Sequence, residues 1–172
     1  MIGPFLQLGA VMAGMFILQA GNGLFATFLA LRMTLEAFPT PIIGLVASGY
    51  PLGFLVSCLL AGRIIHAVGH IRAFAAFAAV QCCATLAFTL LAHPGVWLPL
   101  RFITGLSAAG LFMVGESWLN ERTPTTVRGK VFAAYMISNM TAVSLSQLLL
   151  ALADPAGPAF FMLAAALFSA CL

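Results

Sequence analysis

Charged residues are scarce in this sequence. Only 11 of the 172 residues are Asp, Glu, Lys or Arg, which is 6%, whereas 63% are hydrophobic. A soluble domain carries about 25% charged residues. The chain therefore has too little polar surface to cover a globule in water, and this excludes an ordinary soluble domain.

Enzyme motifs are also missing. The sequence contains no H-E-x-x-H, no G-x-x-x-x-G-K-[ST] and no G-x-G-x-x-G. Residues 105–108 (GLSA) match the G-x-S-x pattern of a membrane serine protease, but no histidine follows His93 to act as the base. We therefore expect no enzyme activity and no cofactor.

Metal-binding patterns are weak. The four cysteines lie in apolar blocks without C-x-x-C spacing, which speaks against both a disulfide framework and a zinc site. His66 and His70 stand four residues apart, as two metal ligands could, but no carboxylate or third ligand lies near them in the sequence. A pair of loop or interfacial histidines is favoured, and no metal is predicted.

What the sequence does contain is long uncharged blocks. No charged residue occurs before Arg32, and further uncharged blocks cover residues 37–62, 73–100, 131–153 and 155–172. Apolar blocks above roughly 18 residues are transmembrane helices, because lipid cannot satisfy the hydrogen bonds of a free peptide backbone. The first block is not a cleaved secretory signal, since it lacks a basic start and exceeds the roughly 7 to 15 apolar residues of such signals.

The predicted fold is all-α, a polytopic membrane helix bundle forming one transmembrane domain over residues 1–172. The spans are expected at about 5–30, 42–61, 73–91, 96–119 and 131–152. Residues 159–172 are apolar but fall short of the roughly 20 residues that cross a bilayer. The sequence thus predicts five complete spans, a truncated sixth, and a fragment of a longer chain.

Lysine and arginine in the connectors predict the orientation. The connector that follows the first span holds only Arg32, whereas the connectors on the other side hold five basic residues: Arg63, Arg72, Arg122, Arg128 and Lys130. Short cytoplasmic loops carry the excess of basic residues. We therefore expect the N-terminus and both basic connectors in the cytoplasm.

Arg101 lies inside the fourth span. An arginine there costs on the order of 2.5 to 3.5 kcal/mol at the bilayer centre, and less near an interface, where its head can snorkel. At helical spacing Gly105, Ala108 and Phe112 share its face, which favours a cavity wall over a lipid-facing surface. Glu116, one turn from the cytoplasmic end, is either a gating carboxylate or an interfacial residue paired with a loop arginine.

Three uncharged polar residues also lie inside spans. Gln19 and Asn22 belong to a Q-A-G-N-G run in the first span, and either support close helix packing or point into a cavity. Asn139 shares a face with Tyr135 and Ser146 in the fifth span. That face either lines a cavity or forms hydrogen bonds with a neighbouring helix.

The first basic connector carries a recognisable motif. Residues 62–72 (GRIIHAVGHIR) resemble the G-x-x-x-D-[RK]-x-G-[RK]-[RK] motif between helices 2 and 3 of the major facilitator superfamily. Gly62 and Gly69 are in register with that motif. His66 stands at its acidic position and His70 at a basic one, which is a departure from the family pattern.

Two further motifs follow in the corresponding places. Arg101 and Gly105, followed by two alanines, resemble the R-x-x-x-G pattern of helix 4. Glu121, Pro124 and the Arg128-Gly129 pair resemble the E-x-x-P-x-x-x-R-G pattern of the next connector. With three motifs in matching connectors, the chain resembles the N-terminal six-helix half of a major facilitator superfamily transporter, of a bacterial branch.

This resemblance implies a 3+3 inverted repeat and a secondary transporter of a small solute, working by alternating access in the inner membrane with proton coupling. Its partners would be the solute, protons, lipid and a missing C-terminal six-helix half, with no nucleic acid. Helices 1 and 4 of the family line the cavity. The implied cavity residues are Gln19, Asn22 and Arg101, and Asn139 on the polar face of the fifth span is a further cavity candidate.

The resemblance also implies a cytoplasmic latch of charge pairs, with Arg63, Arg72, Glu121 and Arg128 as members. Protonation of His66 would modulate that latch. The fifth span lacks the G-P-x-x-G-G pattern of drug/proton antiporters, so the solute stays unassigned. The alternative is a membrane protein that does not transport: a scaffold, a sensor or a defective remnant.

Overall fold

The computed structural model describes residues 3–151 and 154–171, with side chains from residue 8 onward. This part of the chain is helical, and no strand occurs in it. Its helices are α1 (Gly3–Leu35), α2 (Thr40–Val68), α3 (His70–Ala87), α4 (Pro94–Arg122), α5 (Arg128–Leu149) and α6 (Ala159–Ala170).

The helices begin and end where caps and turns place them, beyond several predicted span limits. After α1, Ala37 adopts a left-handed backbone with φ of 55°, and the Phe38 N–H donates to the Met33 carbonyl. At the start of α4 the His93 side chain accepts a hydrogen bond from the Gly95 N–H. Hydropathy marks the thickness of the membrane, whereas these local hydrogen bonds set the helix length.

The first basic connector, predicted as a loop over residues 62–72, is helical except at one position. α2 continues to Val68 and α3 starts at His70, so that only Gly69 separates them. Gly69 has φ of 82° and ψ of 162°, a backbone region that is essentially restricted to glycine. The two helices therefore meet in a one-residue corner.

Four helices in the described residues are long and apolar enough to cross a bilayer, namely α1 from Leu8, α2, α3 and α4. This confirms a polytopic helical membrane protein, although the predicted number of complete spans was five. α5 has 22 residues but carries many polar side chains, including Asn139, Ser146 and Gln147. α6, with 12 residues, is shorter than a span, as the sequence predicted.

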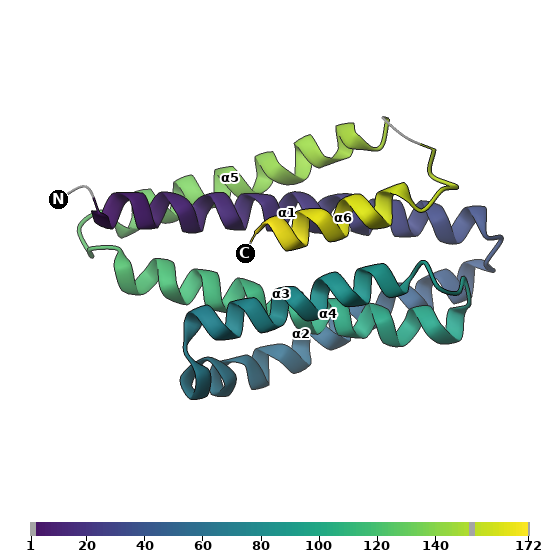
Figure 1. The fold of residues 1–172 in the computed structure, drawn as a ribbon, viewed down its shortest axis with the longest axis horizontal. Helices are drawn as coiled ribbons and strands as arrows, with labels where there is room; N and C mark the ends of the chain where they lie inside the picture. The colour runs from purple at the N-terminus through teal and green to yellow at the C-terminus, as the bar shows by residue number, and fades with distance from the viewer. Residues whose placement is uncertain (1–2, 152–153, 172) are drawn as a thin grey trace.

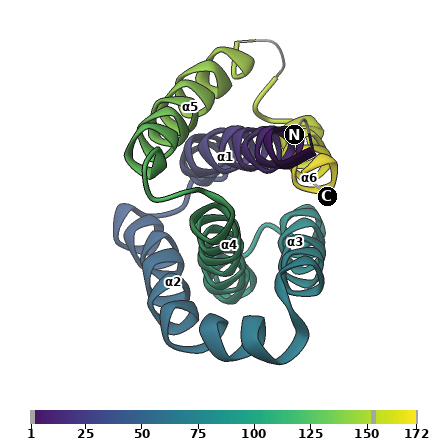
Figure 2. The same cartoon turned by 90° about the vertical axis from the view of Figure 1, so that its left-hand side faces the viewer.

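The bundle is built as two helix triplets. Figure 2 shows α4 between α2 and α3, and α1 between α5 and α6. α3 also contacts α6, and α1 contacts α4. Exchanging α1, α2 and α3 for α4, α5 and α6 turns the contacts of α4 with α2 and α3 into those of α1 with α5 and α6. The same exchange leaves the α3–α6 and α1–α4 contacts unchanged, which is the contact pattern expected of the 3+3 repeat.

The two ends of the bundle differ in their connectors. In Figure 1 the start of α1, the corner between α2 and α3, and the connector from α4 to α5 lie at the same end. The other three connectors lie at the opposite end. Five of the seven basic residues therefore belong to helix ends and connectors at the end that also holds the start of α1, whereas Arg32, in the last turn of α1, lies at the opposite end.

Glycines let α2 and α4 cross in very close contact. A Cβ atom built at Gly105 would overlap the Tyr50 carbonyl oxygen, and one built at Gly53 would overlap the Phe102 carbonyl oxygen. Helices in lipid associate through such small-residue contacts, because burying apolar side chains brings no gain over the lipid tails. This close crossing brings the part of α4 that carries Arg101 against α2.

Aromatic rings connect the two triplets near the end opposite the basic connectors. Phe25 of α1, Phe88 after α3 and Phe161 of α6 lie with ring centroids 5.2 to 6.2 Å apart. Trp97 of α4 joins them, 5.6 Å from Phe88. These rings are buried, and they hold α1 against the first part of α4, where Arg101 lies.

Candidate functional site

Arg101 lies where α1, α2 and α4 meet. Its guanidinium carbon is 4.5 Å from the centroid of the Tyr50 ring on α2 and 5.6 Å from that of the Phe25 ring on α1. These are cation–π distances. The arginine is therefore turned toward two neighbouring helices, and two uncharged rings hold it there.

The acidic residues of the chain are all engaged elsewhere. The sequence has four of them, and each has a partner away from Arg101. They are Glu36 with Arg32 at 2.5 Å, Glu121 with His70 at 3.4 Å, Glu116 with the Tyr135 hydroxyl at 3.2 Å, and Asp154 with the Ala156 N–H at 2.9 Å. Within the described residues, Arg101 therefore has no carboxylate partner.

Buried amides form a second polar group, between α1 and α3. The Gln81 Nε2 donates to the Asn22 Oδ1 at 3.4 Å, and the Gln81 side chain is fully buried. The Gln19 Oε1, the Asn22 Nδ2 and the Gln81 Oε1 are buried without a hydrogen-bond partner among the described residues. No hydrogen bond in this part of the chain joins Asn22 to Arg101, so this amide group is separate from the arginine.

Asn139 lies on α5, which packs on α1. Its side chain is buried, and its Oδ1 has no hydrogen-bond partner in the described part of the chain. On the same helix, the Gln147 Nε2 donates to the Gly23 carbonyl of α1 at 3.3 Å. The polar face of α5 thus provides one hydrogen bond to a neighbouring helix and leaves one buried acceptor free.

Glu116 is exposed, and its Oε1 accepts the hydrogen bond from Tyr135. Of the two alternatives drawn from the sequence, pairing with a loop arginine is not seen among the described contacts. Tyr135 instead ties α4 to α5 close to the end that carries the basic connectors.

His70 stands at the centre of a small cluster at that end. Its Nε2 lies 3.1 Å from the Ser117 Oγ and 3.4 Å from the Glu121 Oε1, and Ser117 Oγ donates to Glu121 at 3.4 Å. The cluster joins the first residue of α3 to the last two turns of α4. It uses the histidine that replaces a basic residue of the family motif.

Two other motif residues, Gly69 and Arg72, line a hollow together with His70 and Glu121. Arg63, His66 and Arg72 are exposed. The Arg128 Nη2 donates to the Thr123 carbonyl at 3.4 Å. Gly62 and Gly129 face open space, because a Cβ atom built at either would meet nothing within 4 Å, whereas Gly69 forms the corner before α3.

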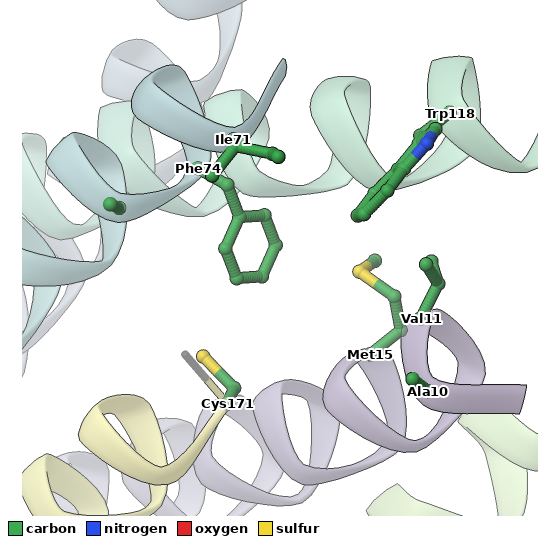
Figure 3. Close-up of a pocket in the computed structure, with 9 residues that line it drawn as sticks. Ala10, Val11, Met15, Ile71, Phe74, Trp118 and Cys171 are labelled. Atoms are coloured by element: carbon green, nitrogen blue, oxygen red, sulfur yellow. The ribbon is translucent and has the colours of Figure 1, made fainter. Parts of the chain in front are cut away.

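An apolar cavity of about 340 Å³ lies between α1, α3, α4 and α6 (Figure 3). Met15, Phe74 and Trp118 line it, together with Cys171 at the end of α6. No charged residue lines it, and it does not include Arg101 or the amide group. The described residues also hold no cluster of three His, Cys, Asp or Glu side chains that could bind a metal ion.

Several residues of these groups were missed from the sequence. Three of these residues lie inside apolar spans and belong to none of the motifs, namely Tyr50, Phe25 and Gln81. A usable signal was Gly49-x-x-x-Gly53 on α2, a small-residue pattern that indicates a close helix contact. It would have predicted that Tyr50, between the two glycines, lies against another helix.

Comparison with known proteins shows which proteins the chain is similar to. No family model and no solved structure matches the chain. The chain is 30% identical over 140 residues, 81% of its length, to an uncharacterized MFS-type transporter of Yersinia pestis (strain Pestoides F). The chain is a relative of the MFS-type transporters. This confirms the resemblance to the major facilitator superfamily that the connector motifs indicated.

Other MFS-type relatives give the same result. The chain is 31% identical over 140 residues to a Yersinia enterocolitica protein and 30% identical over 139 residues to an Escherichia fergusonii protein, both named uncharacterized MFS-type transporters. The names are those of transporters, not of enzymes. The matched region covers 37% of the length of the Yersinia proteins and 36% of the Escherichia protein, so it spans less than half of these relatives.

Proposed function

We propose that the protein takes part in secondary active transport of a small solute across the bacterial inner membrane, by alternating access and with proton coupling. The observation that carries this proposal is the sequence relationship to MFS-type transporters over 81% of the chain. The two-triplet bundle supports it, because an inverted repeat is how many transporters build two access states around one site.

In this proposal the solute binds near Arg101, on the side of α4 that faces α1 and α2. A charged residue inside the membrane that faces the bundle interior marks a solute pathway more often than a purely structural position. Gln19, Asn22 and Asn139 provide further hydrogen-bonding groups, since each keeps a buried polar atom without a partner among the described residues. The rest of the pathway would come from a second six-helix half.

The cluster of His70, Ser117 and Glu121 acts as the cytoplasmic latch in this proposal. It ties α3 to α4 at the end that carries the basic connectors. Arg63, Arg72 and Arg128 remain proposed members that would pair in another access state or with the second half. With the basic connectors in the cytoplasm, the N-terminus is cytoplasmic as well.

Transport by the protein made from its full reading frame tests this proposal. The protein is reconstituted in proteoliposomes, and solute-induced charge movement is recorded on a solid-supported membrane with and without a proton gradient. We expect currents for at least one solute class, a dependence on the proton gradient, and their loss in Arg101→Ala. A protein that inserts and folds but moves no solute of any charge class would favour the scaffold or sensor alternative.

A further inference from the structure

Building on the proposed function, we infer that the transported solute carries an oxyanion, a carboxylate or a phosphate, which binds to the guanidinium of Arg101. The two rings of Tyr50 and Phe25 would orient that guanidinium. The inference concerns the charge class of the solute, which the family relationship leaves open.

The charge balance of the chain is the first argument. A cation inside the membrane is costly unless an opposite charge compensates it. Each of the four acidic residues has a partner elsewhere, as described above, and residues 8–31 of α1 and residues 40–62 of α2, which surround Arg101, contain no charged residue at all. Within the described chain, the guanidinium charge is left for an external anion to neutralise.

The depth of the guanidinium is the second argument. Tyr50 is the tenth residue after the start of α2 at Thr40, and Phe25 is the tenth before the end of α1 at Leu35. At 1.5 Å per residue, each ring lies about 15 Å along its helix from the outer end, whereas Arg101, the seventh residue after Pro94, lies about 10 Å along α4. The two rings therefore lie at least as deep as the Arg101 backbone. A snorkelling arginine would turn its head outward, whereas this one contacts these two rings.

The free edge of the guanidinium is the third argument. Both rings lie at cation–π distances, and a cation over ring faces keeps its N–H groups free to donate in its own plane. No described group accepts a hydrogen bond from the Arg101 side chain, which is only partly buried. A guanidinium with open donors is the group that binds carboxylate or phosphate oxygens in a two-pronged geometry.

The choice of detergent distinguishes between the possible sources of the anion that neutralises Arg101. The anion could come from the solute, from a lipid phosphate, or from an acidic side chain in another part of the protein. We therefore propose measuring binding in dodecyl maltoside, a detergent without an anionic group. Oxyanion binding there requires no lipid phosphate, and a pre-existing ion pair with protein would prevent binding of added oxyanions.

The binding test uses matched probes. Benzoate and inorganic phosphate are the oxyanions, and benzamide and benzylamine are the neutral and cationic counterparts of benzoate. Thermal unfolding of the full protein is followed with each probe. We expect benzoate or phosphate to raise the unfolding temperature, benzamide and benzylamine to have no comparable effect, and Arg101→Gln to weaken oxyanion binding on the order of tenfold or more.

Two further variants complete the test. Lys130→Gln also removes one positive charge, but at an exposed position at the far end of the bundle, and it should bind oxyanions like the unmodified protein. Arg101→Lys keeps the charge without the planar fork, and should keep part of the binding. If Arg101→Gln does not fold, two measurements still test the inference. They are oxyanion binding by Arg101→Lys and the preference of the unmodified protein for benzoate over benzamide.

Several results would overturn the inference: no oxyanion binds, benzamide binds as well as benzoate, or oxyanion binding survives Arg101→Gln. Its failure can be distinguished from failure of the transport proposal. If the reconstituted protein moves a neutral or cationic solute instead, transport stands and the anion inference falls. If oxyanions bind through Arg101 but no solute crosses the membrane, the anion site stands and transport falls.

Discussion

At the residue scale, Gly69 carries the sharpest backbone requirement. With φ of 82° and ψ of 162°, an L side chain at this position is strained by about 1 to 3 kcal/mol. We predict that Gly69→Ala destabilises the protein by that amount, measured by reversible unfolding in mixed detergent. Gly62→Ala, in the interior of α2 with open space around it, is the control and should be neutral or stabilising by up to about 1 kcal/mol.

Ala37 gives a prediction of opposite sign. It holds the left-handed position that ends α1, with hydrogen bonds from its own N–H to Thr34 and from Phe38 to Met33. Glycine is preferred there because a Cβ costs about 1 to 2 kcal/mol in this conformation. Ala37→Gly should therefore stabilise the protein by about 1 kcal/mol in the same assay. Ala79→Gly, exposed within α3, should instead lower stability by a similar amount.

At the scale of helices, the crossing of α2 and α4 depends on Gly105. Because a Cβ there would overlap the Tyr50 backbone, Gly105→Ala must push the helices apart, at a cost of about 1 to 3 kcal/mol. Thermal unfolding measures this loss. Gly44→Ala on α2, where a Cβ meets nothing within 4 Å, is the matched control. Equal unfolding temperatures for the two variants would contradict the close crossing.

The contact between α3 and α4 rests partly on His70 and Glu121. Because this pair is partly exposed, with its Nε2 and Oε1 atoms 3.4 Å apart, we predict a coupling of about 0.2 to 1 kcal/mol. A double-mutant cycle of His70→Gln and Glu121→Gln measures it. A coupling indistinguishable from zero would contradict this contact.

At the scale of the whole molecule, the placement of the connectors predicts which residues face outward. Ala156, between α5 and α6, should be outside, and Lys130, at the start of α5, should be inside. We predict that a membrane-impermeant maleimide added to intact cells labels Ala156→Cys at once, but labels Lys130→Cys only after permeabilisation. The unsubstituted protein gives the background of its four native cysteines. The reverse labelling pattern would invert the proposed orientation.

The sequence alone determined how the chain relates to the membrane. Uncharged blocks force helices in lipid, because no other structure satisfies the backbone there, and the loop arginines and lysine mark one end of the bundle. The motifs around Gly62, Arg101 and Glu121 indicated the resemblance to the major facilitator superfamily, which the similarity to MFS-type transporters confirms. Hydropathy could not determine the length of each helix or the polar face of α5. It is a mean over many residues, whereas a helix cap or a helix face depends on particular side chains.

Only the tertiary structure decided which side chains meet. Glu121 pairs with His70, Asn22 contacts Gln81 of α3, and Arg101 lies against Tyr50 and Phe25. Each contact depends on the rotation and crossing of helices that are distant in sequence, and these are set by small-residue contacts such as the one at Gly105. A linear pattern shows which residues are costly in a membrane, whereas the packing of the helices determines what compensates each of them.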